Sequence, residues 1–264
     1  MVKQVGDSIT LPSQGIYNQF KESAECHVTQ GGKVKSKDDI VGIVKIAWGL
    51  RGIKGKMVTE IVNAWCRTRN ITVEVTDKYG PCNFLYYWIG HRIKGNIDHN
   101  DFREAMKIIY SKLRESPLGT ECRNLYSDIS ETFFGWAKDL FDYNYNREDV
   151  IQKKECSQYL DSGVYYEHVA KAKEAYDKLC EKCGEITDDS YCQEFIREHG
   201  TGIHCKLAWP PALICPTASA PRALSPEKAR MEPTSEVVQK QVMLMPQELV
   251  LHLGFRVYVW VMVS

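Results

Sequence analysis

The sequence has no excess of charge of either sign. Its 264 residues include 34 Lys and Arg and 34 Asp and Glu, so the formal net charge is zero. The two signs alternate, and no long basic stripe is present. Proteins that bind nucleic acid or anionic membranes through electrostatics need such an excess, so neither partner is expected. The mean hydropathy of −0.36 is too polar for a protein with several membrane spans.

Catalytic motifs are also absent. The glycine-rich stretch 49–56 differs from a phosphate-binding loop, because five residues separate Gly49 and Gly55 and Met57 follows Lys56. No histidine lies in a recognisable Ser-His or Cys-His context; the seven are His27, His91, His99, His168, His199, His204 and His252. We therefore predict no catalytic residue, no cofactor and no metal, and a protein that is not an enzyme.

Residues 1–30 have neither the apolar segment nor the small-residue cleavage site of a secretory signal. Prolines are rare in most of the chain, and seven of the 10 lie at or after Pro210. Thirteen of the 14 tyrosines lie at or before Tyr191. These shifts predict a folded domain over residues 1–200, followed by a disordered linker rich in Pro, Ala and Ser over 201–248.

The last segment, 249–264, is a short apolar tail. A spanning helix needs about 20 apolar residues. This segment is shorter and contains His252 and Arg256, and an arginine at mid-span costs about 2.5–3.5 kcal/mol on insertion scales. An exposed or disordered tail is therefore favoured over a membrane anchor.

Helical periodicity dominates the first 200 residues. Apolar residues recur three or four positions apart over 57–66, 82–93, 102–113, 129–140 and 165–183. We expect the fourth of these helices to start at Asp128, with Glu131 as its capping-box partner. A short helix should follow Asp189. The apolar stretch 39–50 fits either a helix or a buried strand, and helix is favoured because its neighbours are helical. The prediction is an all-α domain of six or seven helices.

Cysteine is the most informative residue type that is present. An even set spread over one domain is typical of a disulfide-stapled ectodomain rather than an enzyme. The candidates for structural disulfides are Cys26, Cys66, Cys82, Cys122, Cys156, Cys180, Cys183 and Cys192. This pattern indicates an oxidising environment, whereas the N-terminus shows no route to one.

Several separated motifs resemble the Plasmodium interspersed repeat (PIR) superfamily, of the vivax/cynomolgi/knowlesi-like (VIR/CYIR/KIR) type. They are Ala64-Trp65-Cys66, the stretch 82–90 (CNFLYYWIG), the stretch 134–143 (FGWAKDLFDY), and Leu11-Pro12-Ser13 followed by Tyr17, Phe20 and Cys26. The resemblance covers residues 11 to about 198. Its signature residues, which we expect in the core, are Trp65, Phe84, Leu85, Trp88, Trp136 and Phe141.

The resemblance implies a helical, disulfide-containing variant antigen that a malaria parasite exports to the surface or internal membranes of the infected red cell. Antigenic variation, immune evasion and adhesion through a host-cell receptor are the implied roles, with antibodies as further partners. Members typically lack an N-terminal signal, which would explain the conflict above. They usually end in a hydrophobic span and a basic piece, and this tail departs from that pattern.

The disulfide pairing is left partly open. Cys66 and Cys82 would clamp two consecutive helices near their shared turn, and Cys192 is expected to pair with either Cys180 or Cys183. Two other readings remain. An intracellular helical scaffold would keep these thiols reduced, and a zinc protein would use Cys180, Cys183, Cys192 and a histidine.

Overall fold

The computed structural model describes residues 9–23, 28–30, 33–35, 38, 41–42, 45, 53–73, 79–97, 101–115, 122–152, 156–160, 162–186, 188–200, 205, 209–211 and 215. All belong to one compact unit spanning residues 1–218. The helices of this unit are α1 (Pro12–Gln19), α3 (Gly55–Arg67), α4 (Pro81–Ile93), α5 (Phe102–Glu115), α6 (Glu131–Gln152), α7 (Cys156–Leu160), α8 (Gly163–Lys182) and α9 (Ser190–His199). The predicted helical fold is confirmed.

A short 3-10 turn, η1 (Thr68–Asn70), extends α3. The described residues also contain a small β-hairpin between α1 and α3 in the sequence. Its strand β1 (Val28–Gln30) pairs antiparallel with β2 (Lys33–Lys35), with Val28 opposite Lys35. No strand was predicted from the sequence, and this hairpin, with two strands of three residues each, is an addition to the all-α prediction. The stretch 39–50 lies mostly outside the described residues, although Val41, Gly42 and Lys45 are helical.

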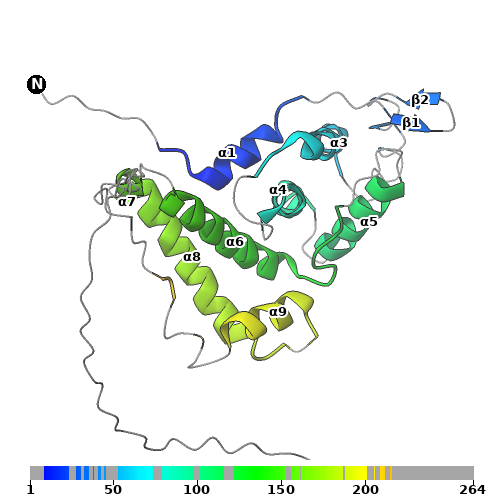
Figure 1. Cartoon of the computed structure of the whole chain (residues 1–264). Helices are drawn as coiled ribbons and strands as arrows, with labels where there is room; N and C mark the ends of the chain where they lie inside the picture. The colour runs from blue at the N-terminus through cyan, green and yellow to red at the C-terminus, as the bar shows by residue number, and fades with distance from the viewer. Residues whose placement is uncertain are drawn as a thin grey trace, which may run out of the picture. The chain divides into compact units, whose positions relative to one another are not determined.

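Helix α4 occupies the centre of the domain (Figure 1), with contacts to α1, α3 and α6. Residues 84–90 and Ile93 are all buried, so the middle of this helix is enclosed on every side, whereas His91 and Arg92 in its last turn are exposed. A helix that is apolar all round is expected to be buried in this way. By contrast, α3 and α5 each bury one stripe and expose the other face.

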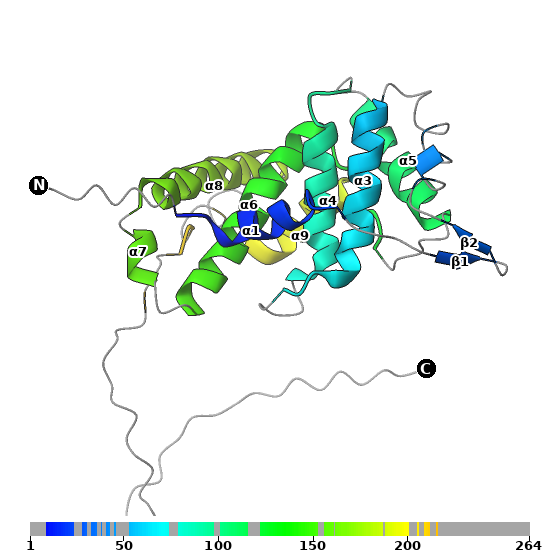
Figure 2. The same cartoon turned by 90° about the horizontal axis from the view of Figure 1, so that it is seen from above.

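The long helices α6 and α8 lie side by side, and α9 packs on the end of α8 (Figures 1 and 2). Local sequence fixes where α8 and α9 begin, because side chains accept hydrogen bonds from their first free N–H groups. Ser162 accepts from Tyr165 N, and Asp189 accepts from Cys192 N at 3.0 Å. The predicted start of the last helix after Asp189 is confirmed.

The predicted start of α6 at Asp128 is wrong. The helix begins at Glu131, and the Ser130 hydroxyl accepts from Phe133 N at 3.3 Å. Asp128 instead accepts hydrogen bonds from the backbone and the hydroxyl of Ser190, at the start of α9. Glu131 is buried and accepts from Gly95 N at 3.2 Å, so its role is to connect α6 to the end of α4.

Two cysteines beyond residue 200 are covalently bonded to the helices. Cys205 is bonded to Cys180 of α8, and Cys215 is bonded to Cys156 of α7. Between them, the Trp209 ring stacks on Tyr176 with centroids 4.5 Å apart. We call the described residues 205, 209–211 and 215 the C-terminal strap. Both cysteines were assigned to the linker by the sequence analysis, and the remainder of that linker and the tail lie outside the described residues.

Candidate functional site

The cysteines hold the domain together at four described places. The bonded pairs are Cys82–Cys122, Cys156–Cys215, Cys180–Cys205 and Cys183–Cys192. Their Cα–Cα distances, 4.9 to 5.8 Å, lie in the usual range for disulfides. Cys66 is also disulfide-bonded, and Cys26 lies outside the described residues.

The predicted Cys66–Cys82 bond is wrong, because the first turn of α4 holds Cys82 against Cys122, 5.1 Å away between Cα atoms. Of the two partners left open for Cys192, Cys183 is the one found. The zinc reading conflicts with this pairing. Three of its four donors, Cys180, Cys183 and Cys192, are disulfide sulfurs and cannot act as thiolate ligands.

Most of the signature residues lie in the core. Trp65, Phe84, Leu85 and Trp88 are at most 5% exposed, whereas Trp136 and Phe141 are partly buried against the core. Phe84 is the centre of an aromatic cluster. The centroid of its ring lies 4.7 Å from that of Tyr145, 4.9 Å from that of Phe141 and 5.6 Å from that of Tyr17, and each pair is edge-to-face. Such edge-to-face pairs stabilise beyond their buried area.

Gly90, the last residue of the motif 82–90, sets the distance between α4 and α6. A Cβ at this position would lie closer than 3.0 Å to three atoms of the Phe134 ring. Phe134 is fully buried and is held by the rings of Tyr86, Tyr87 and Phe102. The close approach of the two helices therefore requires glycine.

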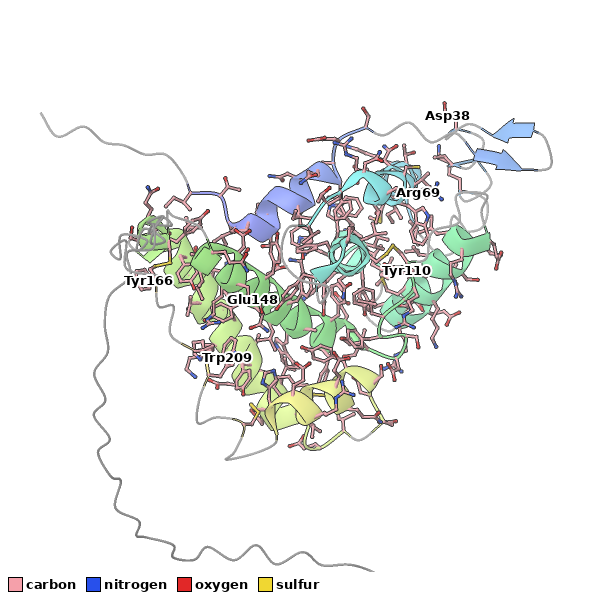
Figure 3. The ribbon with its side chains drawn as sticks, in the orientation of Figure 1. Asp38, Arg69, Tyr110, Glu148, Tyr166 and Trp209 are labelled. Carbon is pink, nitrogen blue, oxygen red and sulfur yellow. A yellow bond between two sulfur atoms is a disulfide. The ribbon has the colours of Figure 1, made fainter. Side chains whose placement is uncertain are left out.

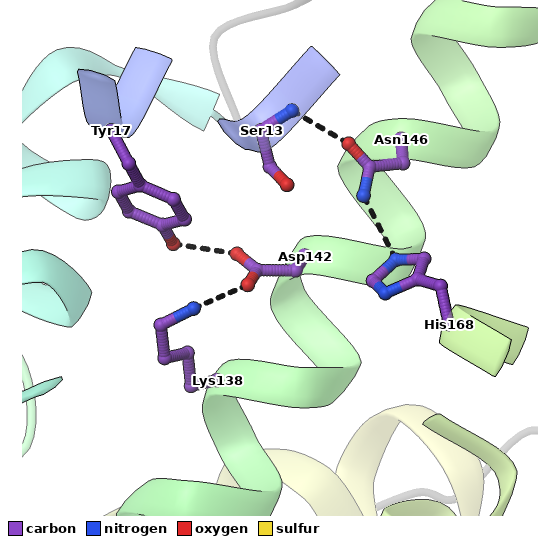
Figure 4. A network of polar contacts seen from close by, with 6 residues as sticks. All are labelled: Ser13, Tyr17, Lys138, Asp142, Asn146 and His168. Atoms are coloured by element: carbon purple, nitrogen blue, oxygen red, sulfur yellow. Dashed lines mark hydrogen bonds and ion pairs between the residues drawn. The ribbon is translucent and has the colours of Figure 1, made fainter. Parts of the chain in front are cut away.

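A polar network joins α1, α6 and α8 (Figure 4). Tyr17 donates its hydroxyl hydrogen to Asp142 Oδ1 at 2.5 Å, and Lys138 Nζ donates to Asp142 Oδ2 at 2.5 Å. The Lys138 ammonium also lies 4.4 Å from the centroid of the Tyr17 ring. Burial, followed by the charge of Asp142, holds the pKa of Tyr17 well above its usual value. The phenol therefore stays a hydrogen-bond donor.

The second half of the network runs through Asn146. Its Oδ1 accepts from Ser13 N at 2.7 Å, and its Nδ2 lies 2.8 Å from Nε2 of His168. Burial is the main cause that lowers the pKa of His168. Three of the contacts drawn in Figure 4 connect different helices, whereas the contact between Lys138 and Asp142 lies within α6.

An open cavity of about 420 Å³ lies beside the network, between the end of α4 and the first half of α6. Its lining residues are His91, Lys94, Glu131, Thr132, Phe134, Gly135, Trp136, Lys138 and Asp139. Burial lowers the pKa of His91 and raises the pKa of Asp139. Three basic side chains, His91, Lys94 and Lys138, and two carboxylates, Glu131 and Asp139, line this cavity. Such a lining suits polar contacts better than it suits an apolar ligand.

This network was not predicted from the sequence. Lys138 and Asp142 are four positions apart in the quoted motif 134–143, which is the spacing of a helical ion pair. Ser13 and Asn146 carried no local signal, because 133 positions separate them. His168 was classed with the scattered histidines, and its neighbours on α6 emerge only from the packing of α6 against α8.

Two further observations bear on the class of protein. Among the helices that the structure describes, none is long and apolar enough to cross a membrane. No group of three or more His, Cys, Asp or Glu side chains in the described ranges is arranged to hold a metal ion. Fold and site together define a disulfide-linked, aromatic-rich helical domain.

The chain belongs to the Plasmodium vivax Vir protein family, whose model matches residues 11–201. No curated protein and no solved structure matches the chain. The predicted membership of the Vir/PIR group is thereby confirmed, and it suggests a Plasmodium variant antigen. The C-terminal strap lies beyond the matched residues, so the described structure continues past the family match.

Proposed function

We propose that this protein is a variant antigen that a malaria parasite exports to the infected red cell, where it serves antigenic variation and immune evasion. Membership of the Vir family is the observation that carries the proposal. In this role the helical core is a scaffold, and the surfaces above it meet antibodies or a host-cell receptor. Adhesion to host cells would follow from the same surfaces.

The cysteine pairing supports an oxidising destination. Cytosolic proteins keep their thiols reduced, whereas the described cysteines here are paired in disulfides with ordinary separations. In an intracellular scaffold with reduced cysteines, the bond between Cys215 and Cys156 would not form. The exported antigen is therefore favoured over the scaffold.

A binding role also fits the polar side chains better than catalysis does. The network side chains Tyr17, Lys138 and Asp142 satisfy one another inside the helix packing. The most exposed large apolar side chain in the described ranges is Tyr166, 63% exposed on the first turn of α8 and drawn at the periphery in Figure 3. Contact with a partner would use such outward-facing groups and the α4–α6 cavity, with no nucleic acid involved.

Cell fractionation tests the proposal. Infected red cells would be opened selectively, so that host-cell contents separate from intact parasites, and the full chain would be detected with antibodies raised against its oxidised form. The proposal predicts the chain in the host-cell fraction, with part of it cleaved when trypsin is added to intact cells. Retention of all the protein inside the parasite would contradict it. A parasite cytosolic protein serves as the control for leakage.

A further inference from the structure

Helix α1 lacks an N-terminal cap of its own. Its N-cap position is Leu11, which has no side-chain acceptor, and Pro12 follows without a backbone N–H. The next free donor is Ser13 N, and Asn146 Oδ1 of α6 accepts it at 2.7 Å. A helix start normally takes its cap from an adjacent Ser, Thr, Asp or Asn. Here the cap comes from a residue 133 positions away.

The Ser13 contact fixes the orientation of the Asn146 amide. A backbone N–H can only donate, so the atom facing Ser13 must be the amide oxygen. The amide nitrogen then faces His168 Nε2, 2.8 Å away, and donates to it. Nε2 is therefore unprotonated and the ring is neutral, with its hydrogen on Nδ1.

Protonation of His168 breaks this arrangement. A hydrogen on Nε2 would face the two hydrogens of Nδ2, so two donors would meet without an acceptor. Rotating the amide would restore the contact with His168 but place Nδ2 against Ser13 N–H, which is also a donor. Asn146 is 0% exposed, so water cannot take over either contact without an opening of the packing.

We propose that Ser13, Asn146 and His168 form an acid-sensitive clasp, which holds the first turn of α1 on α6 when His168 is neutral and releases it when His168 is protonated. The clasp joins three helices through one buried amide (Figure 4). Tyr17, one turn further along α1, stays bonded to Asp142. Release should therefore begin at the start of α1.

The surroundings of His168 favour its neutral form, although the nearby charges act in both directions. On α6, Asp142 favours the protonated ring and Lys138 opposes it, while Lys171 on α8 also opposes it. The Tyr143 ring, whose centroid lies 6.1 Å from that of His168, and the Tyr17 hydroxyl on α1 are both uncharged in the pH range where histidine titrates, because burial raises the pKa of each tyrosine. Burial outweighs the charges, so the pKa of His168 lies below its ordinary value of 6.5.

Proton linkage gives the direction in which the opening of α1 changes with pH. An opened α1 leaves His168 free to take up a proton near its ordinary pKa, whereas the closed clasp resists it. The clasp is therefore fully effective above about pH 6.5, the ordinary histidine value, and weakens as the pH falls below it. At pH 5.0 the population with α1 open should rise by at most about 30-fold, because that pH lies about 1.5 units lower.

Hydrogen exchange on the full chain, with its disulfides intact until quench, tests the clasp. Protection of the peptide covering 11–20 would be compared at pH 7.5 and 5.0 after correction for intrinsic rates, with the α5 peptide 102–115 as internal reference. We expect α1 protection to fall, by at most about 30-fold, while α5 changes little. Equal protection of α1 at the two pH values would overturn the proposal.

Two variants separate His168 from other acid effects. His168→Gln keeps an acceptor for Asn146 but does not titrate, so its α1 protection should not change with pH. His91→Gln removes a different histidine, which is exposed at the end of α4, and should leave the wild-type response in place. A response that persists in His168→Gln would overturn the proposal. Should that variant fail to fold, NMR titration of His168 in the wild-type chain decides, and a pKa at or above 6.5 contradicts the clasp.

Discussion

Replacement of Gly90 by alanine is expected to destabilise the domain, although alanine is the better helix former. The new Cβ would overlap the Phe134 ring at under 3.0 Å, and that ring is enclosed by Tyr86, Tyr87 and Phe102. Overpacking of this kind costs up to about 3 kcal/mol. The higher helix propensity of alanine offsets about 1 kcal/mol of this cost. The net loss is therefore about 2 kcal/mol.

A thermal melt under non-reducing conditions measures this loss. For a domain of about 200 residues, a change of 2 kcal/mol corresponds to a Tm lower by about 4–8 °C. Gly15→Ala in α1 is the matched control, because no atom lies within 4 Å of its new Cβ, and it should be neutral or stabilising. Gly135→Ala meets only the flexible end of Lys94 and should also be mild. A Gly90→Ala protein as stable as Gly15→Ala would refute the packing of α4 on α6.

Three further changes test other parts of the fold. Replacing both Cys82 and Cys122 by serine releases a loop spanning 40 positions and should cost about 4 kcal/mol in a denaturant titration, by the chain-entropy relation; an unchanged midpoint would argue against this bond. Tyr17→Phe removes one hydrogen bond to the buried carboxylate of Asp142 and should cost about 1.5–3 kcal/mol by the same assay, whereas no loss would mean that the contact does not form in solution. A chain ending at residue 201 loses the C-terminal strap with two disulfides and should melt well below a chain ending at residue 218, and equal melting would show the strap to be dispensable.

Local sequence was sufficient for most of the helices. The stripes over 57–66, 82–93 and 102–113 fall within α3, α4 and α5, and the stripe over 165–183 matches α8 to within one residue, since each repeats with the helical period. The start of α6 was missed because Asp128 and Ser130 are both good caps. Contact between Asp128 and Ser190 decides between them, and this contact depends on how α9 packs.

Features that depend on tertiary packing were beyond prediction. Cys82 pairs across 40 positions with Cys122, where proximity in sequence had favoured Cys66. The strap was assigned to the linker because the stretch 201–248 that contains it is rich in proline, alanine and serine. Its place is nevertheless set by Trp209 against Tyr176 and by a hydrogen bond from the Tyr176 hydroxyl to the Cys205 carbonyl at 2.6 Å.

Alkylation of the native protein tests the account most directly. The chain would be isolated from infected red cells and treated with a thiol reagent under denaturing conditions, with and without prior reduction, before its intact mass is measured. We predict that the cysteines of the four described bonds react only after reduction, including Cys205 and Cys215 of the strap. Reaction of these cysteines without reduction would contradict the disulfide-stapled fold and favour a reduced, intracellular protein.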